Sequence, residues 1–278
     1  MVFLFELIAA HRYNRSIHYR KGVDVMIIRE TEDAFIMIKQ HDHAFLSGRV
    51  VEHFSPDLLQ SNHFMKDVRY AAYEHDRSWI GLDETPIWND QAQVPYSFSD
   101  FPLIPKLAFY KIGLDEIEQA NPYASLLCSL HYCSFFSRST DERAVQFLNH
   151  ERKRQAKIKQ NITTLNHELL FEHFRLLQLS DDLSLYICLN EPGVEKNLEH
   201  RWFVDGFANS EIFTADNNPF VANWINQNEI RVSSFPFDNE FDLTLKYKTV
   251  LKSAIQVMGI AKAYESSLSE EHQVFIRK

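Results

Sequence analysis

The sequence predicts an α+β protein that is mainly helical and has one antiparallel sheet formed by strands from both ends of the chain. Short apolar runs typical of strands occur before residue 39 and again after Pro192. Between these two regions, apolar residues recur at helical spacing. The chain has 278 residues, of which 45% are hydrophobic, and this is enough to bury a substantial core.

The N-terminal strands are predicted from a hairpin pattern. Met26–Arg29 and Ala34–Ile38 are apolar runs on either side of a polar turn. Before them, Met1–Ala10 is apolar but too short to span a bilayer, and it lacks the features of a signal peptide. Residues 11–21 are basic and show no periodicity. We therefore expect residues 1–25 to be a non-native or disordered extension and residues 26–278 to form a single domain.

The middle of the chain is predicted to be helical. Ser61, Asn121 before Pro122, and Thr140 before two acidic residues are typical of helix starts. Residues 80–108 contain four prolines, which predicts a long ordered loop. The expected helices cover residues of about 43–53 and 61–75, two segments that begin near 122 and 141, and residues of about 164–189.

The C-terminal region is predicted to complete the sheet. Residues alternate between apolar and polar in Glu229–Val232 and Phe241–Tyr247, and Gln273–Ile276 forms another short run. Val250–Ala263 fits a helix or a loop. Because the strands come from both ends of the chain, we expect one sheet beside a helical middle.

The charge and cysteine content exclude several classes of function. The formal net charge is −9, and the basic run Arg152–Lys159 follows acidic residues on one predicted helix, so we expect no nucleic-acid binding. No apolar run is long enough for a membrane span. Three cysteines without a CxxC pair predict no disulfide framework, which indicates a reducing, cytoplasmic location.

Four places combine His or Asp with apolar surroundings, and they are the candidates for chemistry. They are His43, the adjacent pair His75 and Asp76, His131, and the adjacent pair Asp181 and Asp182, of which Asp182 is the candidate for an exposed residue. Any one of these histidines alone would more often be a hydrogen-bonded core residue. An Asp in so apolar a segment, however, needs a cation or a proton, because burying its charge is costly. Together they predict a site for a divalent ion such as Mn, Fe, Zn or Ni.

The order of these residues resembles the metal-ligand pattern of the HD-domain superfamily of metal-dependent phosphohydrolases. That pattern has a His in a first helix, His-Asp at the end of a second, and an Asp inside a fifth. Ser180–Ser184 is similar to the superfamily motif A-D-R-L-S, which selects Asp181 rather than Asp182. The resemblance implies an HD-like helical core. It also implies that His43, His75, Asp76 and Asp181 are ligands of one ion, with a second ion at His131 left open.

A second resemblance covers most of the chain after residue 25. The sequence is similar to a bacterial family catalogued as domain of unknown function 3891. Its HDxGW-type segment corresponds to His75–Trp79, and Ser180 stands where its last motif has Trp. This family implies no activity. The strings that carry the resemblance are MIIRETEDAFIMIKQHDHAFLSGR, YEHDRSWIGLDETP, NPYASLLCSLHY and LLQLSDDLSLYICLN.

These observations predict a metal-dependent hydrolase that acts on a phosphorylated small molecule. His131 would donate a proton or bind phosphate, and Arg77 and Lys106 are candidate cations for the substrate. Two alternatives stay open. One is a di-iron oxygenase of the HD-like type. The other is a non-catalytic sensor with a ligand pocket lined by Trp79, Trp88 and Phe101. The substrate and the oligomeric state cannot be deduced from the sequence.

Overall fold

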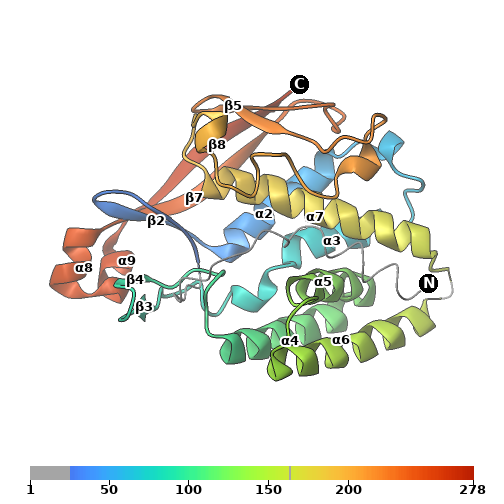
Figure 1. The fold of residues 1–278 in the computed structure, drawn as a ribbon, viewed down its shortest axis with the longest axis horizontal. Helices are drawn as coiled ribbons and strands as arrows, with labels where there is room; N and C mark the ends of the chain where they lie inside the picture. The colour runs from blue at the N-terminus through green and yellow to red at the C-terminus, as the bar shows by residue number, and fades with distance from the viewer. Residues whose placement is uncertain (1–25, 163) are drawn as a thin grey trace.

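A computed structural model describes residues 26–162 and 164–278. The expected extension, residues 1–25, lies outside the described residues. Figure 1 shows an α+β fold in which a sheet made from both ends of the chain lies on one side of a helical body. The predicted fold class is therefore confirmed.

The main sheet has the strand order β1-β2-β7-β8-β6-β5. The N-terminal hairpin joins the C-terminal strands through β2, which pairs antiparallel with β7. All neighbouring strands are antiparallel except β6 and β8, which are parallel. The prediction was an antiparallel sheet, and this one parallel pair departs from it. The strands are β1 (Ile27–Glu30), β2 (Ala34–Ile38), β5 (Ala222–Asn226), β6 (Glu229–Val232), β7 (Phe241–Leu251) and β8 (Ser269–Arg277). Strand β5 was not predicted from the sequence.

The helical body is formed by six longer helices. These are α2 (Gln40–His53), α3 (Met65–Glu74), α4 (Leu103–Ala120), α5 (Pro122–Phe135), α6 (Glu142–Asn161) and α7 (His167–Leu189). Two short helices, α8 (Lys252–Met258) and α9 (Ile260–Ser266), lie between β7 and β8, in the segment for which the sequence allowed a helix or a loop. Short 3₁₀ turns are η1 (Pro56–Leu58), η2 (Arg77–Trp79), η3 (Lys196–Leu198) and η4 (Glu211–Phe213).

Two helix starts differ from the prediction, and one agrees with it. Asn121 caps α5 as expected, because its side chain accepts the backbone N–H of Ala124 at 3.0 Å. Ser61 does not cap α3. The helix begins after Phe64, which has a φ of 64° and whose ring stacks on Tyr123 at 4.3 Å. The start of α6 differs from the prediction by one residue. Its N-cap is Asp141, whereas the sequence predicted Thr140.

The predicted loop over residues 80–108 is shorter than expected. It contains a small hairpin, β3 (Trp88–Asn89) and β4 (Val94–Pro95), and it ends where α4 begins. Two of its prolines lie at the start of that helix. Pro102 is the N-cap, and Pro105 lies in the first turn. Backbone N–H groups in the first turn have no acceptor within the helix, so proline breaks no helical hydrogen bond there. Proline therefore marks a helix start here and not a continuous loop.

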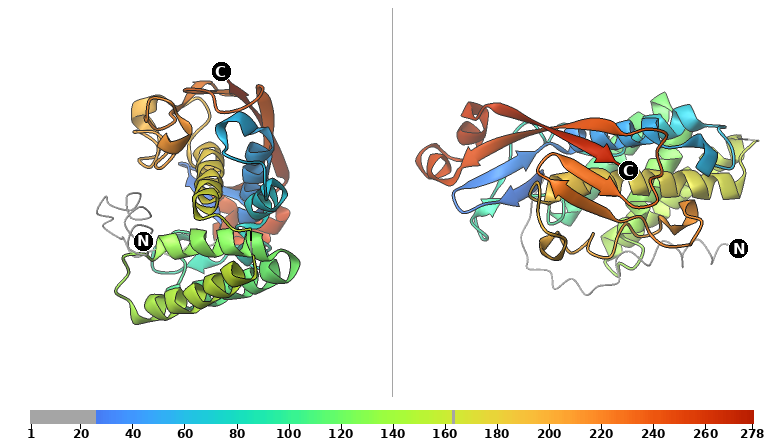
Figure 2. Two further views of the ribbon diagram at one scale, coloured as in Figure 1. Left: turned by 90° about the vertical axis from the view of Figure 1, so that its right-hand side faces the viewer. Right: turned by 90° about the horizontal axis from the view of Figure 1, so that it is seen from above.

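The core lies where α7 crosses the molecule between the sheet and the other helices. Figures 1 and 2 show the sheet on one side of α2 and α7, and α4 and α6 on the opposite side beyond α3 and α5. Helix α7 contacts α2, α3 and α5 as well as β1. Because it is covered on all sides, α7 is buried over Leu169–Cys188 apart from Phe171. Polar residues on this helix are therefore held inside the protein.

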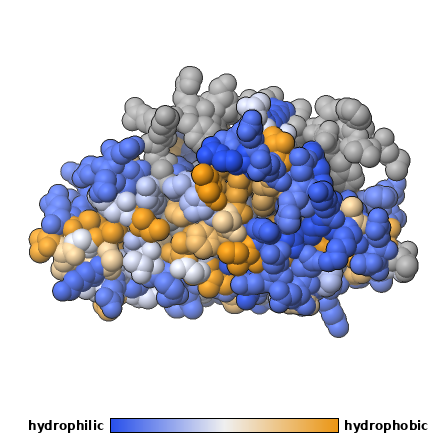
Figure 3. Space-filling view, turned by 90° about the horizontal axis from the view of Figure 1, so that it is seen from below, coloured by the Kyte–Doolittle hydropathy of each residue, from blue (hydrophilic) through white to orange (hydrophobic). Residues whose placement is uncertain are grey.

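The outer face formed by α4 and α6 is partly apolar. Figure 3 shows hydrophobic side chains gathered in the middle of the face seen from below, with hydrophilic ones around them. Ile104 and Ile112 of α4 are among the large apolar side chains that are exposed.

None of the helices in the described part of the chain has both the length and the hydrophobicity that a membrane span requires. The cytoplasmic location stays a prediction.

Candidate metal centre

Five buried side chains from four helical segments converge on one point. His43 lies in the first turn of α2, and His75 and Asp76 lie where α3 ends. His131 comes from α5, and Asp181 comes from the middle of α7. Their residues are between 1% and 8% exposed. The fold thus brings these five predicted residues to one place between α2, α3, α5 and α7.

The donor atoms of the centre are close to one another. His43 Nε2 lies 3.2 Å from His75 Nε2 and 3.1 Å from Asp181 Oδ1. His75 Nε2 is 3.5 Å from the same carboxylate oxygen. Asp76 Oδ2 is 3.7 Å from both imidazole nitrogens. His43, His75 and Asp181 thus form a group in which one donor atom from each residue could reach a common ion.

The orientation of His75 is set by the backbone. Its Nδ1 lies 2.8 Å from the carbonyl oxygen of Ala72. A carbonyl can only accept, so Nδ1 carries a hydrogen, and the Nε2 of the neutral ring presents a lone pair. That lone pair faces the centre. The ring is therefore held in the state in which histidine binds a metal.

His43 is held in the same way by a serine pair. Ser184 Oγ donates to the carbonyl of Asp181 at 2.9 Å, so it accepts from His43 Nδ1 at 2.7 Å. Ser47 Oγ lies 2.7 Å from Ser184 Oγ and completes the arrangement. We assign the hydrogen of His43 to Nδ1, which leaves Nε2 with a lone pair. Two imidazole lone pairs and a carboxylate then meet in one buried space.

The electrostatics of the centre favour a cation. Burial alone would lower the pKa of His75, but the charges of Asp76 and Asp181 outweigh it and raise that pKa to about 9. Burial would raise the pKa of Asp181, yet the hydrogen bonds that His43 and His75 form with it when Nε2 is protonated hold it well below its usual range. The pKa of Asp76 is raised by burial. A donor set that holds a proton this tightly also attracts a metal cation.

The spacing of the donors fits a single divalent ion. Nitrogen and oxygen ligands lie ~2.1 Å from such an ion, which places neighbouring ligand atoms ~3.0 to ~3.4 Å apart in octahedral or tetrahedral geometry. The separations among His43, His75 and Asp181 are 3.1, 3.2 and 3.5 Å. Imidazole and carboxylate together suit Mn, Fe, Zn or Ni. The residues present therefore fit the expected cofactor, and the identity of the ion stays open.

Comparison with known protein families shows a match to one family model. The model of a family described as "Protein of unknown function (DUF3891)" matches residues 26–252. The chain belongs to the DUF3891 family. Every residue of the candidate metal centre lies inside the matched region. No curated protein and no solved structure matches the chain. Membership of the HD-domain superfamily stays a prediction that rests on the arrangement of the donor residues.

In this DUF3891 protein, His131 faces a different oxygen of the Asp181 carboxylate from the one that His43 faces. Its Nε2 lies 3.6 Å from Asp181 Oδ2, whereas His43 and His75 face Oδ1. The ring of His131 also packs at right angles to that of His75, with centroids 5.5 Å apart. His131 is thus placed beside the three-residue group, where it can exchange a proton or contact a bound molecule.

The two predicted substrate cations, Arg77 and Lys106, are bound by other groups of the protein. Arg77 forms ion pairs with Glu74 at 2.9 Å and with Glu116 at 2.7 Å, and its side chain is 34% exposed. Lys106 is buried and donates to the carbonyl of Phe98 at 2.8 Å. Burial lowers the pKa of Lys106 to about 8. Both cations therefore already have partners within the fold.

The aromatic pocket expected for a sensor is not formed by the three predicted residues. Trp79 is buried, and it packs against Phe101 at 5.9 Å and Tyr110 at 5.4 Å. These rings fill part of the core beside α4. Trp88 lies elsewhere, on β3, and contacts Phe35. Trp88 lines a pocket whose lining includes neither Trp79 nor Phe101.

Two buried polar residues of α7 could not be recognised from the local sequence. Asp182 was the candidate for the exposed member of its pair, but it is 3% exposed because α7 is covered on all sides. His173 is fully buried, and its Nδ1 forms a hydrogen bond of 2.7 Å with the hydroxyl of Tyr123. In both cases the local sequence gave no sign of how many elements surround α7.

Asp83 has a role that its sequence did not reveal. Its carboxylate accepts the backbone N–H groups of Gln40 and His41, each at 3.0 Å. These are the first two residues of α2, so Asp83 serves as its cap from another part of the chain. The turn that it fixes carries His43. Ser184, which was also missed, could have been found as the last residue of the motif that selected Asp181.

Proposed function

We propose that this protein is a metal-dependent hydrolase that acts on phosphorylated small molecules. The observation that carries the proposal is the orientation of two histidines. His43 and His75 each use Nδ1 for a fixed partner and turn Nε2 toward the other, 3.2 Å apart. Without a cation or proton between them, this arrangement would leave two lone pairs facing each other beside Asp181.

The residues that would hold the ion are His43, His75, Asp76 and Asp181. Two carboxylates balance the charge of one divalent ion, and two neutral imidazoles add no charge. A divalent ion held there supplies Lewis acidity toward a phosphoryl oxygen and makes water more acidic. Because the donors are buried, their interactions with a charged group are only weakly screened by solvent.

His131 is the residue that we assign to proton transfer. In the proposed reaction, water attacks phosphorus, and the bond between phosphorus and the ester oxygen breaks. The leaving oxygen keeps the electron pair and takes a proton from His131 Nε2, and the attacking water restores that proton. Asp181 Oδ2, 3.6 Å away, stabilises the imidazolium form. Arg77 has no part in this proposal, because Glu74 and Glu116 already bind it.

One observation favours a second candidate, the di-iron oxygenase. The two oxygens of Asp181 face different histidines, Oδ1 toward His43 and His75 and Oδ2 toward His131. If a second ion were bound, Asp181 and His131 would be the residues that hold it. An electron paramagnetic resonance spectrum of a mixed-valent di-iron pair in the purified protein would favour the oxygenase over the hydrolase.

The hydrolase is tested by phosphatase assays with and without added Mn²⁺, Ni²⁺ or Zn²⁺, on p-nitrophenyl phosphate and a panel of phosphorylated metabolites. We expect activity that requires one of these ions and that is abolished by chelation. His131→Gln should lower kcat by ~10²- to 10⁴-fold, the usual contribution of a general acid, while metal content is retained. Asp181→Asn should lose both metal and activity.

The matched control is Asp182→Asn, which makes the same chemical change at the neighbouring buried position. Metal-loaded protein without activity on any phosphate ester would contradict the hydrolase proposal. Protein that binds no metal and keeps its fold in the His75→Ala variant would favour the non-catalytic sensor instead.

A further inference from the structure

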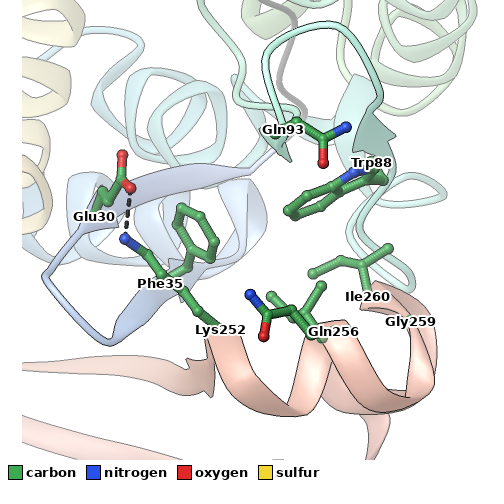
Figure 4. Close-up of a pocket in the computed structure, with 9 residues that line it drawn as sticks. Glu30, Phe35, Trp88, Gln93, Lys252, Gln256, Gly259 and Ile260 are labelled. Atoms are coloured by element: carbon green, nitrogen blue, oxygen red, sulfur yellow. Dashed lines mark hydrogen bonds and ion pairs between the residues drawn. The ribbon is translucent and has the colours of Figure 1, made fainter.

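A second site lies at the end of the molecule where α8 and α9 project from the sheet. It is a pocket of about 550 Å³ between β2, the β3–β4 hairpin and the two short helices. Figure 4 shows its lining side chains pointing into a shared space from three directions. None of the five residues of the metal centre lines it. Its volume is in the range of pockets that bind small molecules.

The walls of this pocket are aromatic and aliphatic. The rings of Phe35 and Trp88 lie 6.4 Å apart and are nearly perpendicular, at 78°. Ile255 and Ile260 add aliphatic surface from α8 and α9. These residues belong to a small hydrophobic cluster that is separate from the main core. Because these two rings are in edge-to-face contact with each other, a flat ligand ring would pack against the surface that they form together on the side of the pocket.

The polar groups of the pocket carry no net charge. Lys252 Nζ forms an ion pair with Glu30 Oε1 at 2.7 Å, so the one cation in the lining is neutralised by the one anion. Lys252 Nζ also lies 5.1 Å from the ring centroid of Phe35. A phosphate or carboxylate entering here would meet the Glu30 carboxylate. The pocket is therefore suited to an uncharged ligand, unlike the metal centre.

Two glutamine amides face the pocket from opposite sides. Gln93 comes from the β3–β4 turn and Gln256 from α8 (Figure 4). Gln93 Nε2 donates to the carbonyl of Asp90 at 2.8 Å, which leaves its Oε1 available as an acceptor. Within the described part of the chain, the Gln256 amide makes no hydrogen bond. A side-chain amide presents one donor and one acceptor side by side, the pattern that pairs with the edge of a nitrogen heterocycle.

We propose that this pocket binds an uncharged planar nitrogen heterocycle with the chemistry of a purine base. Trp88 and Phe35 would pack against the ring, and the side-chain amides of Gln256 and Gln93 would form hydrogen bonds with its edge. The proposal does not depend on the hydrolase. The same ring occurs in a free base, a nucleoside and a nucleotide, and the test separates these sources.

The test is a titration of the full-length protein with adenine, adenosine and AMP, followed by saturation-transfer NMR and tryptophan fluorescence. We expect adenine or adenosine to bind and AMP to bind no more tightly. Trp88→Ala should weaken binding about tenfold or more, and Trp88→Phe should keep most of it. Gln256→Ala should also weaken binding. It lies on an exposed helix face, so the fold should be unaffected.

Two controls separate this pocket from other sites. Val257→Ala changes an exposed residue of the same helix outside the pocket, and it should bind adenosine like the unmodified protein. Asp181→Asn should also leave binding unchanged. The proposal is overturned if adenine and adenosine do not bind at millimolar concentrations, or if only AMP binds. It is equally overturned if Trp88→Ala and Gln256→Ala bind normally, or if binding is lost in Asp181→Asn.

Discussion

The hydroxyl of Ser184 ties two candidate metal ligands together. Its Oγ accepts from His43 Nδ1 at 2.7 Å and donates to the backbone carbonyl of Asp181 at 2.9 Å. One side chain on α7 therefore fixes the ring orientation of a histidine on α2 relative to the helix that carries the acidic ligand. Partners of this kind set the tautomer and the direction of a histidine that binds metal.

Ser184→Ala should weaken metal binding while leaving every donor of the centre in place. Loss of such a partner usually lowers metal affinity ~10- to 100-fold, because the imidazole is no longer held in one tautomer. Competition with a chromogenic chelator would measure the change. Ser180→Ala is a matched control, since Ser180 is also buried on α7 and donates to the carbonyl of Leu177 at 2.8 Å. Equal metal affinity in the two variants would show that Ser184 does not support metal binding.

Asp83→Ala should destabilise the protein and weaken the metal centre together. The change removes both acceptors for the N–H groups of Gln40 and His41, at the start of the helix that carries His43. Loss of a helix cap costs ~0.5–2 kcal/mol. Chemical denaturation gives this value, and chelator competition gives the metal affinity. Asp83→Asn keeps one acceptor oxygen and should lose less of both. If α2 is fixed by other contacts, both variants will match the unmodified protein.

Gly113→Ala should disturb the turn that follows Asp76. A Cβ at this position of α4 would lie 2.8 Å from the backbone N and Cα of Ser78. Backbone cannot move aside as a flexible side chain can, so α4 and η2 must separate. Overpacking of this kind costs ~1–3 kcal/mol, measurable by thermal or chemical unfolding. At Gly81 a Cβ would meet nothing within 4 Å, so Gly81→Ala is the control and should be nearly neutral. Similar losses in both variants would argue against the close approach.

His173 should make the protein sensitive to mild acid. Burial, together with the charge of His63, lowers its pKa from 6.5 to about 4. The unfolded chain therefore takes up a proton before the folded one does. The stability that this group contributes is fully present above pH 6.5 and is lost as the pH falls through 4. The loss amounts to ~3 kcal/mol at most.

The measurement for His173 is the unfolding free energy as a function of pH. His173→Asn removes the titration and keeps a polar side chain that can hydrogen-bond to Tyr123, so its stability should fall less steeply between pH 6.5 and 4. His150→Asn, at an exposed histidine, should follow the unmodified protein. Identical slopes in all three proteins would show that His173 is not buried in its neutral form.

The ligand residues were predictable because their chemistry conflicts with their surroundings. Asp181 lies in an apolar run, and an adjacent His-Asp pair ends a helix pattern, so a shared partner for these groups could be inferred before any geometry was known. The hairpin and the longer C-terminal strands were predictable from alternation. These signals are local, and the structure brings His43, His75 and Asp181 together.

What could not be predicted depends on neighbours distant in the sequence. Asp83 looks like a turn residue until α2 is seen to begin beside it. Asp182 and His173 look like surface residues until α7 is found to be covered on every side. Arg77 follows the His-Asp pair directly, but two glutamates draw its side chain to the surface. Burial of this kind is set by packing between elements, and periodicity within one helix does not report it.

The most direct test of the central claim is the metal content of the purified protein. Protein prepared without chelator should contain about one divalent ion per chain by elemental analysis, a stoichiometry set by one group of converging donors. Asp181→Asn should reduce that content at least tenfold, and Asp182→Asn should retain it, since Asp181 and not Asp182 belongs to the group formed with His43 and His75. Equal metal content in the two variants, or none in the unmodified protein after reconstitution with Mn²⁺, Fe²⁺, Zn²⁺ and Ni²⁺, would contradict the account.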